Sequence, residues 1–499
     1  MHAMNKISTA AAALLLPIGM ATAQVATPIL RIGEPQQQAL GPKTIGHPNG
    51  SLTGERRGLV VLLAFGDLDF STDVPKTDFD RLLNEEGFSD NGAPGSVHDY
   101  FLSQSGGQFS VTFDVVGPFR LSKSVTYYGA NVGANGRDDQ RRIHEMVTEA
   151  LRGVDDEVDF STYDWNGDGE AEHVQFVYAG YGEASGAPEY TIWPMETVLG
   201  DDSLRLDNVC INTFSCSSEL YGNSGRELAG LGTFCHEFSH CLGLPDMYDT
   251  SGSTASFGMG YWDVMSHGNY NGNGWTPSAF TSYERMFCGW LQPIELKEPC
   301  RVEKMKPLVS GGEAYIIRNP ANAGEYYLLE NRYQTSWDGG QRGSGLLIIH
   351  VNYNETAWEY NRVNASAFGQ QGCTIFHADN SDGLSTLADL AGDVYPYTCY
   401  SPYKLCNELT DTSEPAATLA TANTDGTFLM HCAITDIKRT GRNISFTFNG
   451  GTDLSGVEAI DERPLPPDNS FYDLSGRRVV DYQLRKGPYV RGGKKVAVK

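Results

Sequence analysis

The 499-residue sequence has little positive charge. It contains 37 Lys and Arg residues against 62 Asp and Glu residues, which gives a formal net charge of −25. A nucleic-acid-binding protein needs a basic surface to neutralise phosphate groups. This balance therefore excludes nucleic acid as the expected partner. It suits a soluble exported protein or a protein that binds cations.

Long hydrophobic runs are missing after the first 23 residues. No later window approaches the roughly 18 consecutive apolar residues that a transmembrane helix needs, so we expect no transmembrane segment. Residues 1–23 have a weakly basic start (His2, Lys6), an apolar run (Ala10–Met20) and small residues at the end (Ala21–Ala23). This is the layout of a signal peptide, and the alternative is a buried N-terminal helix. We predict a secreted protein, in the periplasm in transit and then extracellular or on the cell surface.

Internal repeats are also missing, which argues against a solenoid. The length allows several domains, each with a core of its own, and we expect a monomer. Glycine is frequent, at 56 residues, which indicates many turns and short strands. The ten cysteines are an even number in an exported chain, so they could form disulfides or remain free, and their pairing cannot be chosen from sequence.

Hydrophobic periodicity predicts a mixed α/β segment in the first part of the chain. Residues 59–65 form an unbroken apolar run, typical of a buried parallel strand. Residues 174–179 read as a second strand, which we expect at the substrate-side edge of the sheet. Residues 96–103, 138–152 and 227–242 read as helices.

The pattern changes near residue 297. Short alternating runs at 326–329, 346–351 and 444–448 are separated by Gly, Asn and Asp clusters, which predicts an all-β module. We therefore divide the chain into five parts. They are a signal peptide (1–23), a linker or short pro-segment (24–56), a catalytic domain (57–296), a β-rich, sandwich-like domain (297–450) and a basic C-terminal tail (451–499).

The segment from residue 233 to 246 carries the strongest chemical signal. On a helix, positions i and i+4 share a face, so His236 and His240 can present two imidazoles to one metal ion. Glu237 lies beside the first of them, where it can reach a metal-bound water. Gly243 should end the helix, because glycine tolerates the left-handed cap conformation. The chain can then turn so that Asp246 becomes the third ligand.

Three protein ligands leave one coordination position for water, which is typical of catalytic zinc. Asp249 is a second nearby acid, so the choice of Asp246 depends on the turn at Gly243. The alternative is an ordinary core helix with two hydrogen-bonded histidines. Such a helix has little structural reason to combine two histidines, an acid and a glycine turn, so we predict zinc.

Residues 236–249 resemble the zinc signature of the immune inhibitor A family of secreted metalloproteases, relatives of the metzincins. The likeness extends over about residues 57–450, although Met195 stands where we would expect a histidine. Supporting segments are Ser96–Gly106, Ile192–Pro194, Trp262–Gly268 and Cys288–Leu291.

The resemblance implies an α+β, metzincin-like zinc protease domain followed by the β-rich domain. It also implies that Met265 belongs to a methionine turn and forms an apolar floor beneath the metal, where its alternative role is plain core packing. His267, two residues later, is a candidate for stabilising the transition state. Tyr270 and Tyr283 compete for that role.

A second candidate metal site precedes the strand at 174–179. Acidic and amide side chains alternate there and a glycine follows, as in the first half of a calcium loop. Position 12 of the loop is Gln175 and not glutamate, so the loop differs from an EF-hand, and the alternative is a solvated acidic turn. The candidate calcium ligands are Asp164, Asn166, Asp168, Glu170 and Glu172.

The last 29 residues, 471–499, carry eight Lys or Arg against two Asp. They resemble C-terminal sorting tails of proteins exported by the type IX secretion route. The alternative is a small β-hairpin addition with solvated charges.

We therefore predict a secreted zinc metalloendopeptidase that acts on protein or peptide substrates, with zinc and calcium as cofactors. Glu237 would take a proton from the metal-activated water and return it to the leaving amine. Two other classes stay open. One is a zinc hydrolase with a non-peptide substrate, and the other is a catalytically silent adhesin that binds through residues 297–450.

Overall fold

The computed structural model describes residues 52–132, 137–251, 256–366, 370–383, 387–400 and 403–451, and four short strands between residues 471 and 498. The predicted signal peptide and most of the predicted pro-segment lie outside the described residues. Within the described part of the chain, no helix has both the length and the apolar character needed to cross a membrane.

The first part of the chain is built on a five-stranded sheet in the order β2–β1–β6–β10–β7. These strands are β1 (Gly54–Ala64), β2 (Phe109–Arg120), β6 (Val174–Tyr181), β7 (Met195–Val198) and β10 (Thr213–Leu220). Four of them are parallel, and β7 pairs antiparallel with β10. The strand β6 is therefore central, and our expectation that it forms the substrate-side edge is wrong; β2 and β7 are the edge strands.

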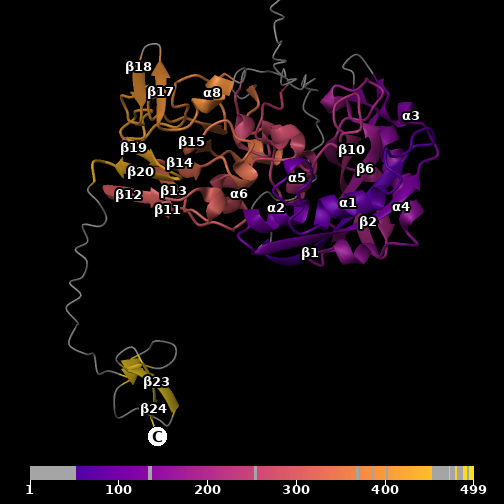
Figure 1. Ribbon diagram of the computed structural model, residues 1–499, viewed down its shortest axis with the longest axis horizontal. Helices are drawn as coiled ribbons and strands as arrows, with labels where there is room; N and C mark the ends of the chain where they lie inside the picture. Colours follow the sequence, from indigo (N-terminus) through magenta and orange to yellow (C-terminus); the bar gives the residue numbers. More distant parts are fainter. Residues whose placement is uncertain are drawn as a thin grey trace, which may run out of the picture.

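Small two- and three-residue strands accompany this sheet: β3 (Asn131–Val132), β4 (Arg137–Asp138), β5 (Glu170–Ala171), β8 (Leu204–Leu206) and β9 (Val209–Ile211). The helices of the described chain are α1 (Pro75–Asn84), α2 (Val97–Gln104), α3 (Val125–Gly129), α4 (Gln140–Val154), α5 (Gly232–Cys241), α6 (Ser282–Phe287), α7 (Glu355–Glu359) and α8 (Leu387–Ala391). Figure 1 shows α5 near the middle of the molecule, with β6 and β10 to one side of it.

The predicted helices are present with shifted ends. Ser96 caps α2 by accepting the Asp99 N–H, and the Asp99 side chain in turn accepts the Ser96 N–H. The zinc-motif helix was expected from residue 227 but begins at Gly232. Its start is delayed because Gly230 has φ of +75°, which is not helical.

The second part of the chain contains two further sheets. One has the order β11–β13–β14–β15–β16, and the other has the order β12–β20–β19. The first consists of β11 (Ile294–Glu295), β13 (Tyr315–Asn319), β14 (Asn322–Arg332), β15 (Gly345–Asn352) and β16 (Cys373–Ile375). The second consists of β12 (Cys300–Met305), β19 (Ile434–Thr440) and β20 (Asn443–Phe448), and β17 (Tyr397–Tyr400) forms a hairpin with β18 (Tyr403–Cys406).

The sheet around β14 and β15 is buried on both faces. Along β14, Tyr326 and Leu328 belong to the hydrophobic core that also contains α5, whereas Tyr327 and Leu329 belong to the core shared with the three-stranded sheet. Side chains of a strand alternate between faces, so one strand contributes to two cores. Residue 297 is therefore not a break in packing, because the core of the first part continues into the second.

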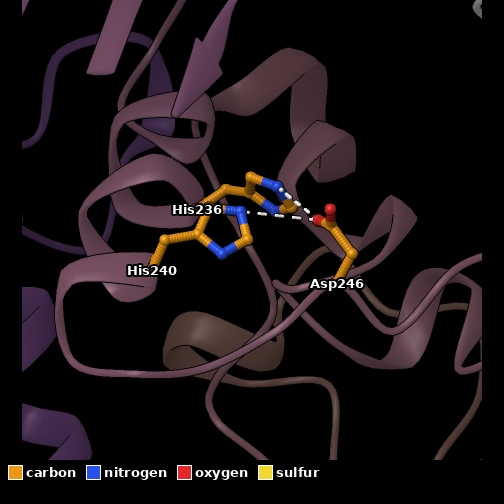
Figure 2. A group of neighbouring side chains, drawn as sticks. All are labelled: His236, His240 and Asp246. Carbon is orange, nitrogen blue, oxygen red and sulfur yellow. Dashed lines mark ion pairs between the residues drawn. The ribbon is translucent and has the colours of Figure 1, made fainter. Parts of the chain in front are cut away.

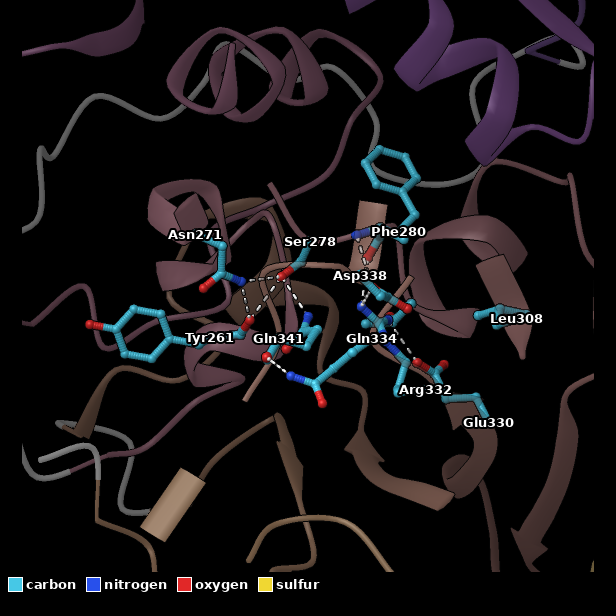
Figure 3. A network of polar contacts seen from close by, with 12 residues as sticks. Tyr261, Asn271, Ser278, Phe280, Leu308, Glu330, Arg332, Gln334, Asp338 and Gln341 are labelled. Atoms are coloured by element: carbon cyan, nitrogen blue, oxygen red, sulfur yellow. Dashed lines mark hydrogen bonds and ion pairs between the residues drawn. The ribbon is translucent and has the colours of Figure 1, made fainter. Parts of the chain in front are cut away.

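Buried polar contacts join the same two parts (Figure 3). The Arg332 guanidinium, which is fully buried, pairs with Glu330 at 3.0 Å and with Asp338 at 2.5 Å. It also donates to the carbonyl of Ala279 at 3.2 Å. Gln341 donates to the hydroxyl of Ser278 at 2.7 Å. Removing one partner from such a network leaves a buried charge or donor unpaired, which costs several kcal/mol.

All ten cysteines are free thiols, and the sulfur atoms of Cys399 and Cys406 lie 3.9 Å apart. The described residues of the basic tail form a four-stranded sheet in the order β22–β21–β23–β24. Its strands are β21 (Phe471–Tyr472), β22 (Arg478–Val479), β23 (Gly487–Arg491) and β24 (Lys494–Val498).

Candidate metal centre and active site

Helix α5 carries the two histidines, and glycines set both of its ends. A Cβ on Gly232 would lie 1.9 Å from the carbonyl oxygen of Asn269, so only glycine lets the helix begin against that segment. Gly243 has φ of +92°, a conformation that favours glycine, and it reverses the chain after the helix. His236 and His240 are one turn apart and therefore face the same side.

The turn after α5 brings Asp246 back to the histidines (Figure 2). The Nε2 atoms of His236 and His240 lie 3.1 Å and 3.5 Å from the same Oδ1 atom of Asp246. Among the described residues, this is the only group of three or more His, Cys, Asp or Glu side chains whose ligand atoms all lie within 4.8 Å of one another. The Oδ1 atom is buried and has no hydrogen bond of good geometry. Two imidazoles and one carboxylate are a donor set that fits zinc.

The second nitrogen of each imidazole is already paired. Nδ1 of His236 lies 2.8 Å from the carbonyl oxygen of Val264, and Nδ1 of His240 lies 2.7 Å from that of Leu244. A carbonyl can only accept, so each Nδ1 carries the proton. Both Nε2 lone pairs are then directed to the point shared with Asp246, as metal coordination requires.

The histidines and Asp246 strongly shift one another's pKa values. Burial alone would lower the pKa of His240, but the Asp246 carboxylate outweighs it and raises that pKa to about 10. Burial opposes ionisation of Asp246, but the two histidines hold its pKa well below the usual value. A cation bound between the three side chains would replace the protons that the histidine Nε2 atoms otherwise hold.

Glu237 lies next to His236 on α5, and its side chain is buried. Burial raises the pKa of its carboxyl above the ordinary value, although His236 and His240 oppose the rise. A carboxylate with a raised pKa beside a metal position is a suitable proton acceptor.

The segment expected to form the methionine turn contacts the first histidine through the Val264 carbonyl. Met265 is fully buried, and its carbonyl accepts the Met247 N–H at 2.7 Å. Its own N–H donates to Asp263 Oδ1 at 2.7 Å. Because Val264 accepts from His236, this turn fixes the orientation of one histidine.

The three candidates for stabilising the transition state differ in position. The ring of His267 lies 6.2 Å from that of Tyr248, which in turn lies 6.5 Å from that of His236, and burial and then the charge of His236 lower the pKa of His267 to about 4. Burial and then Glu237 raise the pKa of Tyr270 to about 12. Tyr283 is buried elsewhere, and its hydroxyl accepts from Trp358 Nε1 at 2.5 Å. The structure therefore favours His267 and Tyr270 over Tyr283.

Asp249 does not join the histidines. Its Oδ1 accepts the backbone N–H groups of Ser251 at 3.0 Å and Ser366 at 3.2 Å. It therefore holds the loop after the metal ligands together.

The acidic loop before β6 is closed by its own backbone. Asp164 accepts N–H groups from Gly167 at 2.7 Å and Gly169 at 2.9 Å. Asn166 donates to Asp168 at 3.0 Å, Asp168 accepts from the Glu170 N–H, and Glu172 accepts from the Trp165 N–H. The carboxylates are not gathered at one point in the way that the zinc candidates are. Calcium binding here stays a prediction.

Sequence reasoning missed two neighbours of Asp246. The ring of Tyr248 lies 6.5 Å from that of His236, at an interplanar angle of 23°, and burial and then the Asp246 charge raise the pKa of Tyr248 well above its ordinary value. Asn361, 115 residues away in the chain, forms two hydrogen bonds to Asp246. Tyr248 could have been found from its closeness to the motif, but no sequence pattern pointed to Asn361.

The edge strand β7 lies against α5. Its residue Glu196 contributes to the raised pKa of His240, after the larger effect of Asp246. The outer edge of β7 has no strand partner among the described residues. This edge strand thus lies beside the helix that carries the two histidines.

Comparison with known proteins gives one family match. Residues 67–291 match the immune inhibitor A peptidase M6 catalytic domain. This segment contains α5, Asp246 and the turn at Met265, and such a metallopeptidase domain implies a catalytic metal.

Two curated relatives agree with this match. The chain is 29% identical over 239 residues to the pre-pro-metalloprotease PrtV of Vibrio cholerae serotype O1, over 40% of this chain and 25% of that protein. It is 26% identical over 245 residues to immune inhibitor A of Bacillus thuringiensis subsp. alesti, over 44% of this chain and 36% of that protein. The chain thus spans only about a quarter to a third of these relatives' lengths.

Proposed function

We propose that the protein is a secreted zinc-dependent endopeptidase, in which His236, His240 and Asp246 hold the metal. The observation that carries the proposal is the convergence of three buried ligand atoms beside a buried glutamate. The similarity of residues 67–291 to a metallopeptidase domain supports it, and the signal-peptide layout of residues 1–23 supports secretion.

Bound zinc would supply a Lewis acid that polarises the scissile carbonyl and makes its water more acidic. Glu237 accepts the proton of the attacking water and passes it to the leaving amine. His267 has a pKa of about 4, so it is neutral at neutral pH and has one N–H to donate to the developing oxyanion. Met265 is the apolar floor behind the histidines.

The position of β7 at the edge of the sheet, against α5, supports an extended peptide as the substrate. Strand edges bind extended chains through backbone hydrogen bonds, which are largely independent of side chains. A protein chain in extended form can pair with β7 and pass beside α5. A small non-peptide substrate has no use for such an edge.

The proposal is tested with the purified protein and unfolded casein. We expect cleavage that a zinc chelator abolishes and that added zinc restores, with new peptide termini identified by mass spectrometry. Cleavage of only non-peptide esters or amides would favour the alternative zinc hydrolase. Binding without any cleavage would favour the adhesin.

A further inference from the structure

The third proposed metal ligand is held by a residue from the second part of the chain. Asn361 lies just after α7, and its Nδ2 donates to Asp246 Oδ2 at 2.7 Å. Its Oδ1 accepts the backbone N–H of Asp246, also at 2.7 Å. One amide group therefore binds both the side chain and the main chain of the same aspartate.

This double contact determines which carboxylate oxygen is left for the metal. Oδ2 is occupied by Asn361, whereas Oδ1 faces the Nε2 atoms of His236 and His240 without a hydrogen bond of its own. A free aspartate would have to lose side-chain freedom when it binds a cation. Asn361 removes that freedom in advance.

Neighbours of Asn361 hold the rest of the loop that follows α5. The side chain of Asn364 donates to the carbonyl of Met247 at 2.8 Å, and Gln371 accepts the Gly258 N–H at 2.6 Å. The carbonyl of Asn361 accepts from the Thr250 hydroxyl at 2.9 Å. The described part of the loop that carries Asp246 is thus bound at several positions by residues beyond position 360.

We propose that Asn361 is a positioning residue for the metal, and that through it the β-rich second part completes the metal site. This inference rests on the proposed zinc site and assigns the second part a role in forming it. Partners that orient a metal ligand typically contribute 10–100-fold to metal affinity.

The test is the zinc dissociation constant of the full-length protein, measured by competition with a chromophoric chelator. Asn361 has φ of +53°, where alanine would add backbone strain, so Asn361→Gly is the variant that removes the amide cleanly. Asn361→Asp keeps the shape but cannot donate to Asp246 and places a second negative charge beside it. We expect both to weaken zinc binding about 10–100-fold.

The matched control is Asn331→Ala. Asn331 is buried in β14, and its Nδ2 donates to the carbonyls of Met305 and Arg442 at 2.8 and 2.9 Å. This variant should lose stability and keep wild-type zinc affinity. The melting temperature of each variant is recorded so that measurements are made on folded protein.

Zinc affinity within twofold of wild type in both Asn361 variants would overturn the inference and leave the proposed function standing. Equal weakening by Asn331→Ala would overturn it as well, because general loss of stability would then explain the effect. If Asn361→Gly does not fold, Asn361→Asp decides alone. Failure of the wild-type protein to bind zinc would overturn the proposed function itself, and the inference with it.

Discussion

At the scale of single residues, Glu237 allows chemistry to be separated from metal binding. Its carboxylate is buried beside the histidines but is not one of the three converging ligands. Glu237→Gln keeps the shape and removes the proton acceptor. We expect peptide cleavage to fall by about 10²–10⁴-fold, the usual contribution of a general base, with zinc content unchanged by atomic absorption. Residual activity within a factor of two of wild type would remove Glu237 from the mechanism.

Two neighbouring aspartates should respond differently to the same substitution. Asp246→Ala removes a converging ligand atom, so zinc occupancy should fall. Asp249→Ala removes hydrogen bonds to Ser251 and Ser366, so it should lower the melting temperature and leave zinc occupancy near normal. Metal analysis of the two dialysed variants compares them directly. If the two variants exchange behaviour, our assignment of the third ligand is wrong.

At the scale of an element, β4 ends in a carboxyl group, that of Asp138, whose pKa is far above the ordinary value. Burial raises the pKa of Asp138 to about 7, against a lowering contribution from the Trp193 N–H, which donates to it at 2.9 Å. An unfolded aspartate titrates near pH 3.9. Between about pH 4 and pH 7 the folded protein thus holds a proton that the unfolded chain has released. Stability contributed by this group is present at low pH and is lost as the pH rises through 7.

Asp138→Asn should therefore remove a stability slope of up to about 1.4 kcal/mol per pH unit between pH 4 and pH 7. Chemical denaturation of wild type and variant across this range measures it. Asp139→Asn is the control, because Asp139 has a lowered pKa and is ionised in both states within the window. If the free energy of unfolding depends on pH in the same way in wild type and Asp138→Asn, the pKa of Asp138 is not raised in the folded protein.

The loop before β6 gives a prediction of the same scale. Asp164, Asp168, Glu170 and Glu172 place four negative charges within nine residues, and oxygen ligands at this spacing favour calcium. We expect calcium to raise the melting temperature and to slow self-digestion. A free concentration 100 times the dissociation constant would stabilise the fold by about 2.7 kcal/mol.

The double variant Asp164→Ala and Asp168→Ala should abolish the calcium response. Because Asp164 also accepts backbone N–H groups, the variant will be less stable without calcium, so the quantity to compare is the increment that calcium adds. Magnesium should add much less, since it dehydrates reluctantly. A wild-type melting curve unmoved by millimolar calcium would reduce the loop to an acidic turn.

At the scale of the whole molecule, the first part should not fold without the second. Leu328 of β14, with Leu347 and Ile349 of β15, fills the core that also contains α5. A chain that ends at residue 296 would lack these side chains, and the apolar residues of the first part that they cover would be exposed to water. We expect it to lack a cooperative thermal transition and to bind zinc weakly. Circular dichroism and chelator competition test both points, and a cooperative transition with wild-type affinity would contradict them.

How far the sequence predicts the molecule depends on the distance over which each feature is determined. The facing histidines follow from the helical repeat, the return of Asp246 follows from Gly243, and the run at 59–65 is buried as expected, with residues 59–64 in β1. These features are local. The contact between Asn361 and Asp246 joins residues 115 positions apart, and asparagine is too common in loops to indicate a partner. The start of α5 also depends on a contact that is distant in the sequence, because Gly232 packs against Asn269.

The alternation along β14 also limits how the chain can vary in length. Tyr326 and Leu328 enter one core, and Tyr327 and Leu329 enter the other. One inserted or deleted residue inside this strand would send every later side chain to the opposite face, so both cores would receive side chains shaped for the other. Insertions between strands carry no such penalty. The loops can therefore lengthen, whereas β14 and β15 have to keep their length for both cores to stay filled.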